Sequence, residues 1–286
     1  WTEYIKDYKG VEEKIYPRML ALSEALWSIN KPGYNDFLVR LKDFHLPLLD
    51  KNGVNYSKAL NQSNLVISSR EGGVDLNITA SDSKYRIKAK DKGVVLSALS
   101  TLSLPIYSEQ EESTREIEVE TLNTEEKRVD FFKKTILVHP LLGKTWEISP
   151  QPSANYMGDG ALTLTDGNKG QRPWNGKEWL GFRESEVQLS ITNKEVLPIK
   201  EVKMGFLNAP SSWIYLPEKV EISYSKNGRK WRTKTFEVSK ENEVFELGEK
   251  AKFISLTVIA KDKIPLGMQG AGSIPWLFID EVYFTW

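Results

Sequence analysis

The sequence predicts a mainly β protein with a short helical segment at its N-terminal end. Three observations support this division of the 286 residues. Apolar residues recur every three or four positions before about residue 55, and the period changes to two from about residue 58, as in the alternation at 74–79. After about residue 140, short apolar runs stand between glycines, prolines and turns. A period near 3.6 places side chains on one face of a helix, whereas a period of two places them on one face of a strand.

Two amphipathic helices are expected in the N-terminal segment. The first covers residues 11–28, and Pro17 fits near its start, where the missing N–H costs least. One face of this helix carries a stripe of apolar side chains. The stripe consists of Ile15, Met19, Leu22 and Leu26. The second helix covers residues 34–50, after a break at Pro32-Gly33. Each stripe must be buried against another surface.

A small β domain is expected over residues 58–138. Its strands include residues 74–79 and 116–120, where apolar and polar side chains alternate, and a further strand at 128–138. The acidic stretch at 109–112 reads as a loop between strands.

A larger β domain is expected over residues 139–286. The segment Lys226-Asn227-Gly228 is typical of a hairpin turn. Several short strands with turns between them indicate an antiparallel sandwich. Strands are expected over residues 187–191, 199–207, 220–225, 233–238, 253–260 and 277–284.

Composition excludes several classes of site and partner. With 39 basic and 39 acidic side chains, no net charge draws the chain to nucleic acid or to an anionic membrane. No apolar run approaches the roughly 18 residues of a membrane span. The absence of cysteine excludes disulfides, thiolate nucleophiles and Cys-ligated zinc. The two histidines, His45 and His139, are expected to be structural, so carboxylates and aromatic side chains are the candidates for function.

Several short motifs follow one another in the N-terminal segment. They are Trp1-Thr2-Glu3-Tyr4-Ile5 and residues 15–27, 37–41 and 46–56. In this order they resemble the end of the catalytic domain of family-20 glycoside hydrolases, the β-N-acetylhexosaminidases and chitobiases. That domain is a (β/α)8 barrel. The resemblance therefore implies that residues 1–57 are the last helices of such a barrel.

The same resemblance assigns roles to two residues. Trp1 would form a wall of the pocket for the non-reducing N-acetylhexosamine, and Glu3 would accept hydrogen bonds from its hydroxyls. An indole face suits the apolar face of a pyranose, and a carboxylate suits hydroxyl donors. Alternatively, Trp1 is only a chain end and Glu3 a solvated acid of a first helical turn.

The resemblance implies no catalytic residue in this chain. Family-20 enzymes let the substrate's 2-acetamido oxygen attack the anomeric carbon, assisted by an adjacent Asp-Glu pair on an earlier barrel strand. This chain is expected to begin after that strand. Asp280-Glu281 is a similar pair, but it lies in an alternating strand of another domain and is expected not to be catalytic.

Residues 58–138 stand where such enzymes often carry a small immunoglobulin-like domain. Residues 139–286 resemble a discoidin-like (galactose-binding-like) sandwich, a jelly roll. The resemblance rests on residues 164–167, 179–182, 213–217, 220–228 and 278–282.

Two kinds of site are expected in this sandwich. Domains of this kind often hold a structural calcium ion, which requires six to eight oxygen ligands. The matching residues are Asp166 and Glu281, with Asn168 as a third, and the alternative is a loop without metal. The aromatic residues Tyr156, Trp174 and Trp276 lie in or beside loops and could stack on a sugar, although they could also belong to the core.

The sequence therefore predicts the C-terminal part of an exo-acting β-N-acetylhexosaminidase, with no catalytic cofactor. Its partners would be glycans or chitin-like oligomers that end in N-acetylglucosamine or N-acetylgalactosamine, and the family implies an exported protein. Two alternatives remain: the sandwich is a carbohydrate-binding module, or both β domains only support the barrel. The apolar helix stripes could also mediate oligomerisation.

Overall fold

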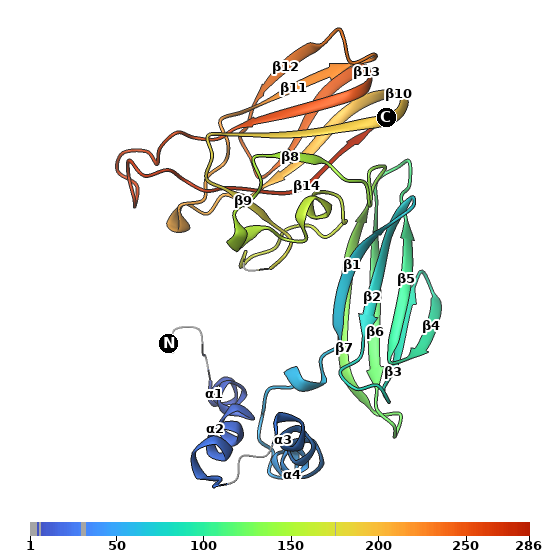
Figure 1. Ribbon diagram of the computed structural model, residues 1–286, viewed down its shortest axis with the longest axis vertical. Helices are drawn as coiled ribbons and strands as arrows, with labels where there is room; N and C mark the ends of the chain where they lie inside the picture. The colour runs from blue at the N-terminus through green and yellow to red at the C-terminus, as the bar shows by residue number, and fades with distance from the viewer. Residues whose placement is uncertain (1–4, 6, 30–32, 175) are drawn as a thin grey trace. The chain divides into compact units, whose positions relative to one another are not determined.

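The computed structural model describes residues 5, 7–29, 33–174 and 176–286. The chain forms two compact units, Trp1–Ser63 and Asn64–Trp286. The first unit is helical, and the second consists of antiparallel strands with short 3-10 helices (Figure 1). The predicted fold class, mainly β with a helical N-terminal part, is confirmed. Within the described residues, no helix is long and apolar enough to cross a membrane.

The helical unit has one more break than expected. Its elements are α1 (Tyr8–Ile15), α2 (Arg18–Trp27), α3 (Tyr34–Arg40), a π turn (Leu41–His45), α4 (Leu46–Lys51) and a 3-10 turn (Ala59–Asn61). The single helix expected over 11–28 is divided at Pro17. The residue before a proline favours extended backbone, and Tyr16 accordingly has φ −96° and ψ 140°. The helix expected over 34–50 is continuous through the π turn.

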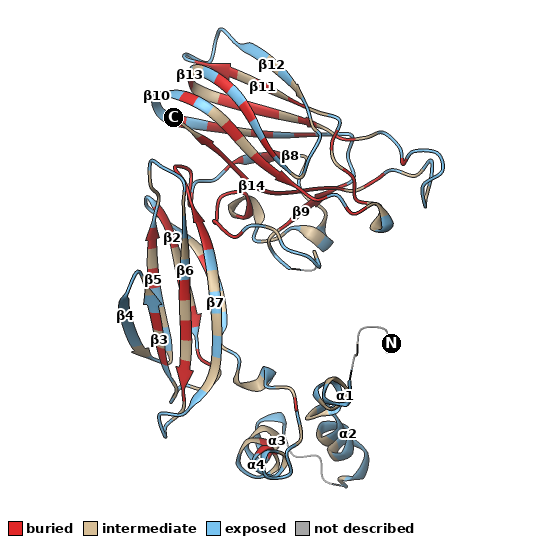
Figure 2. Cartoon of the chain, turned by 180° about the vertical axis from the view of Figure 1, so that it is seen from behind, coloured by how far each residue is buried: buried red, intermediate tan, exposed pale blue. Residues whose placement is uncertain are grey.

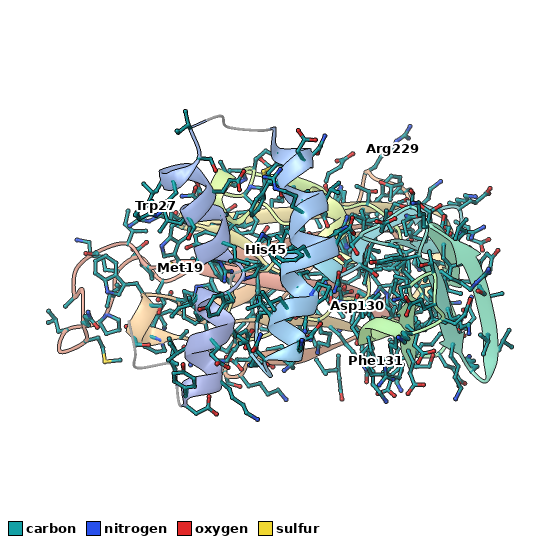
Figure 3. The ribbon with its side chains drawn as sticks, turned by 90° about the horizontal axis from the view of Figure 1, so that it is seen from below. Met19, Trp27, His45, Asp130, Phe131 and Arg229 are labelled. Carbon is teal, nitrogen blue, oxygen red and sulfur yellow. The ribbon has the colours of Figure 1, made fainter. Side chains whose placement is uncertain are left out.

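The helical unit buries only a small apolar core. Leu41, Leu46 and Tyr56 are buried, whereas no residue of α1, α2 or α3 is. The stripe predicted on the first helix remains open. The exposed fractions are 39% for Ile15, 48% for Met19, 52% for Leu22 and 71% for Leu26. Figure 2 shows these helices mostly in the colour of exposed residues, and Figure 3 labels Met19 and Trp27 on α2.

The small β domain consists of seven strands in two antiparallel sheets. The first sheet has the order β1 (Asn64–Arg70), β2 (Gly73–Thr79), β5 (Thr101–Tyr107). The second has the order β4 (Val94–Leu99), β3 (Arg86–Asp91), β6 (Ser113–Leu122), β7 (Arg128–Val138). Buried side chains from both sheets form one core, as in an immunoglobulin-like sandwich. The loop predicted at 109–112 joins β5 to β6.

The C-terminal domain is built on a seven-stranded antiparallel sheet. Its order is β12 (Arg232–Glu237), β11 (Lys219–Ser225), β13 (Asn242–Ile259), β10 (Glu186–Phe206), β14 (Leu277–Thr285), β9 (Leu180–Phe182), and β8 (Glu147–Ser149) also pairs with β10. Short 3-10 helices lie at Ala154–Tyr156, Gly160–Leu164 and Pro210–Ser212.

Two strands of this domain, β10 and β13, are longer than the sequence suggested, and β13 begins at Asn242 instead of residue 253. The strands expected at 187–191 and 199–207 are the two ends of β10, which continues through a register shift between Thr192 and Leu197. Such an irregularity bends a strand, so that its two halves can face different parts of one core. The hairpin turn predicted at 226–228 joins β11 to β12, as expected.

Candidate functional site

The two sugar-pocket residues implied by the family resemblance, Trp1 and Glu3, lie outside the described residues. Their role stays a prediction. The other candidate residues all belong to the C-terminal domain, and the structure places them in two groups.

The three predicted platform residues come together. Tyr156 belongs to a 3-10 helix, Trp174 to the loop before β9, and Trp276 directly precedes β14, yet all three pack against one buried apolar cluster that includes Trp179 and Phe278. The Tyr156 and Trp276 rings meet edge to face with centroids 5.1 Å apart. Phe278 lies beneath them, 4.8 Å from Tyr156 and 6.0 Å from Trp276. This convergence could not be predicted from spacing in the sequence.

The platform residues are partly exposed, whereas the aromatic residues that support them are buried. Tyr156, Trp174 and Trp276 keep part of their surface open, while Trp179 is 4% exposed. The Trp179 indole N–H donates to the Gln171 carbonyl at 3.0 Å, which fixes the loop that carries Trp174. Half-open aromatic rings on a rigid base are suited to stacking on a flat apolar ligand face.

Charged side chains border this aromatic surface. The Arg183 guanidinium lies over the Trp276 ring, 5.2 Å from its centroid. Arg172 contacts Glu241 and donates to the Asn208 carbonyl at 3.0 Å. A cavity of about 240 Å³ lies between Arg172, Trp179 and Glu241. Apolar faces beside fixed donors and acceptors are the pattern of small-molecule sites.

The second group surrounds an acidic loop, residues 165–168, which faces β14. Its side chains Asp166 and Asn168 are buried, and so is Glu281 of β14. Glu281 Oε1 accepts from the Gly167 N–H at 2.6 Å, and Asp166 Oδ1 accepts from the Asn168 N–H at 2.7 Å. A side-chain hydrogen bond joins the Asp166 and Glu281 carboxyls. The structure therefore brings the predicted pair of carboxyls together.

Gly167 allows the loop to approach β7. It has φ +76°, and a Cβ atom at this position would lie 2.6 Å from the Leu137 carbonyl oxygen. The residue that follows Asp166 must therefore be glycine, for reasons of both conformation and space. The Asp-Gly pair in the sequence was the signal for this turn.

His139 completes the surroundings of Glu281. Its Nδ1 accepts from the Leu141 N–H at 3.2 Å, which leaves Nε2 to carry the proton toward Glu281 Oε2 at 2.9 Å. Burial lowers the pKa of His139 to about 3, so this contact is a hydrogen bond from a neutral ring and not an ion pair. The expectation that His139 is structural agrees with this arrangement.

Burial also dominates the titration of the carboxyls. It raises the pKa of Glu281 to about 8 and that of Asp280 to about 6, and the neighbouring Asp280 charge adds to the effect on Glu281. The pKa of Asp166 is raised by burial and then by the charge of Glu281. A hydrogen bond between two carboxyls needs one proton. The raised pKa values of Asp166 and Glu281 favour retention of that proton.

Known proteins resemble this chain over part of its length. Residues 1–30 match the family model described as "Glycosyl hydrolase family 20, catalytic domain". The predicted resemblance to family 20 is confirmed over this segment. Among solved structures, a fucose binding module of Streptococcus pneumoniae is 18% identical; the match covers 50% of this chain and 90% of the module, with a TM-score of 0.37.

Two further solved structures match a similar share of the chain. A pectin binding carbohydrate binding module is 15% identical, with 49% of this chain and 87% of the module covered and a TM-score of 0.34. A chitosan-binding module from a chitosanase/glucanase of Paenibacillus sp. IK-5 is 14% identical, with 49% and 94% covered and a TM-score of 0.33.

The Asp280-Glu281 pair does not have the surroundings of a catalytic pair. The two carboxyls are 3% and 1% exposed, and as neighbours in β14 they point to opposite faces of the sheet. Asp280 Oδ2 accepts from the Gly170 N–H at 2.9 Å, and both Glu281 oxygens face N–H donors. Both carboxyl groups are therefore buried hydrogen-bond acceptors within the folded domain.

Sequence reasoning missed two basic residues of these sites. Lys134 of β7 donates to Asn168 Oδ1 across the domain boundary, and Arg183 covers Trp276. Each contact joins residues more than 30 positions apart. The strand pattern around Lys134 does not indicate its contact with Asn168. The alternating pattern of β7 indicated only which side chains share a face.

Proposed function

We propose that this chain is the C-terminal part of an exo-acting β-N-acetylhexosaminidase of family 20, in which it has an accessory role. The match of residues 1–30 to the family's catalytic domain carries this proposal. The open stripe on α2 supports it, because a helix on the outer wall of a barrel packs one apolar face against the strands. The parent enzyme would release terminal N-acetylglucosamine or N-acetylgalactosamine, and its family suggests an exported enzyme.

A chromogenic N-acetylglucosaminide assay tests the accessory role. This chain should show no turnover above buffer, because the reaction needs an Asp-Glu pair that the resemblance places on an earlier strand. Turnover that is lost in an Asp280→Asn, Glu281→Gln double variant would overturn the proposal. The same assay on an intact parent enzyme should show hydrolysis, and absence of N-acetylhexosaminidase activity there would refute the family-20 assignment of substrate.

For the sandwich we propose glycan binding at the aromatic surface formed by Tyr156, Trp174 and Trp276. The convergence of these residues on one rigid cluster, bordered by Arg183, is the observation that favours it. An N-acetylated sugar offers an apolar ring face for the aromatic side chains and hydroxyl and amide groups for the charged ones.

Calorimetric titration with N-acetylglucosamine oligomers tests this binding. Trp174→Ala should weaken the affinity by about tenfold, since loss of about 1.4 kcal/mol of stacking corresponds to that factor. Trp231→Ala is the matched control, because Trp231 is also a partly exposed tryptophan but lies on the β11–β12 hairpin. If no oligomer binds the unaltered chain, the alternative that both β domains only support the barrel is favoured.

A further inference from the structure

Several oxygen atoms at the acidic loop are already engaged by donors of the protein. The Thr165 carbonyl accepts from the Gly143 N–H at 2.8 Å, and the Gly167 carbonyl accepts from the Leu137 N–H at 2.7 Å. Of the side-chain oxygens, Glu281 Oε1 and Oε2 face the N–H groups of Gly167 and His139. The protein's own N–H groups, among them those of Leu137 and Gly143, thus already engage oxygen atoms that a bound cation would need.

A positive charge is nevertheless present at the loop. Lys134, whose side chain is partly buried, extends from β7 and donates from Nζ to Asn168 Oδ1. Burial lowers the pKa of Lys134, and the nearby charges of Glu178 and Asp166 oppose this effect. An ammonium has three donors and one charge, so it can neutralise a carboxylate and satisfy an amide oxygen at the same time.

The residues do not fit the calcium site that the resemblance implies. Calcium requires six to eight oxygens at 2.3–2.6 Å. Asn168, the predicted third ligand, turns its oxygen to Lys134, and the remaining two ligands share a hydrogen bond with each other. Within the described ranges, no three side chains of the His, Asp and Glu types are grouped closely enough to hold a metal ion.

We propose that Lys134 takes the place of a calcium ion and makes the acidic loop independent of metal. The small β domain then contributes a side chain to the folding of the sandwich, because Lys134 belongs to β7 and its partners to the loop at 165–168. The inference does not depend on the proposed enzymatic function. It concerns how the two β domains are joined, whatever ligand the sandwich binds.

Calcium titration and thermal unfolding of the unaltered chain provide the first test. Calorimetric titration with calcium chloride should show no saturable binding below millimolar concentration. The unfolding temperature of the second unit should be the same with a chelator and with added calcium. Saturable binding, or a lower unfolding temperature in the chelator, would refute the proposal without any variant.

Variants at two neighbouring lysines provide the second test. Lys134→Met keeps the apolar stem and removes the charge, and it should lower the unfolding temperature by about 3 to 6 °C, because a buried acceptor and a carboxyl lose their partner. Lys133→Met is the matched control, since Lys133 pairs with Glu116 and Glu118 at the exposed surface. Lys134→Arg, which retains the charge, should recover part of the loss. Equal unfolding temperatures for Lys134→Met and Lys133→Met would refute the proposal.

Discussion

Buried carboxyl groups in the C-terminal domain are held by donors from distant segments of the chain. Glu281 lies between the Gly167 N–H and the His139 ring, and Asp280 accepts from the Gly170 N–H. Leaving any of these oxygens without a partner would cost about 1–3 kcal/mol. Burial costs less free energy for a protonated carboxyl than for a charged one. These residues therefore link the stability of the domain to pH.

The pH dependence of unfolding follows from two pKa shifts. The pKa of Glu281 is raised from 4.5 to about 8, so its contribution to stability is complete below pH 4.5 and is lost as the pH rises to about 8. The pKa of His139 is lowered from 6.5 to about 3, so its contribution is present above pH 6.5 and is lost as the pH falls toward 3. The two windows overlap between pH 4.5 and pH 6.5, where the two dependences oppose each other, so the combined contribution of these groups should be greatest there and fall on both sides.

Glu281→Gln separates the two contributions. Glutamine does not titrate, so the free energy of unfolding of this variant should fall less than that of the unaltered chain between pH 6 and pH 9, whatever the absolute stability of the variant. Urea unfolding at both pH values measures this difference. Identical losses in the two proteins would show that Glu281 does not titrate in this range.

Among the elements, α2 and β14 differ strongly in how many of their residues are buried. All nine residues of β14 except Thr285 are buried, whereas α2 has none. Met19, Leu22 and Leu26 lie at helical spacing on one face of α2, so the difference lies in what covers that face. An uncovered stripe contributes little to stability, because removal of apolar area from water is the source of the stabilisation.

Two leucines of the helical unit provide a direct comparison. Leu26→Ala should change the free energy of unfolding by less than about 0.5 kcal/mol, because Leu26 is 71% exposed. Leu41→Ala should cost about 2–5 kcal/mol, because Leu41 is 2% exposed and occupies the core of the unit. Chemical denaturation followed by far-UV circular dichroism at the helix signal distinguishes these values. A large loss for Leu26→Ala would mean that its stripe is covered in solution, for example by a second copy of the chain.

The whole molecule contains separate apolar cores rather than one. The helical unit has its own cluster around Leu41, and the larger unit has clusters in the small β domain and in the sandwich. Cores that share no side chains can lose their structure at different temperatures.

Calorimetry should therefore show at least two unfolding transitions. Leu41→Ala should lower the temperature of one transition, and Ile222→Ala, at a fully buried position of β11, should lower the temperature of another. The helical unit is expected to unfold first, because its core is small and the stripe on α2 is open. A single transition shifted by both variants would show that the units unfold together.

Local patterns in the sequence predicted which segments form helices and strands more accurately than they predicted where those elements begin and end. The alternation at 74–79 and the turn at 226–228 gave strands and a hairpin where the structure has them. Pro17 marked a helix start, but its effect on Tyr16 divided the helix that was expected to include both. The composition of residues 192–197 predicts a gap between two strands, because a bulge and a loop have similar compositions, whereas β10 continues through this segment.

The sequence by itself determined the helical and strand segments, the resemblance of the N-terminal residues to family 20, and the Asp-Gly turn, since each depends on residues close together in the chain. Only the tertiary structure decided that Tyr156, Trp174 and Trp276 meet on one cluster and that Lys134 faces the acidic loop. These contacts join segments that the chain's periodicity cannot relate to each other. Which residues meet is determined by the pairing of strands, and by the free energy lost when a buried polar group has no hydrogen-bond partner.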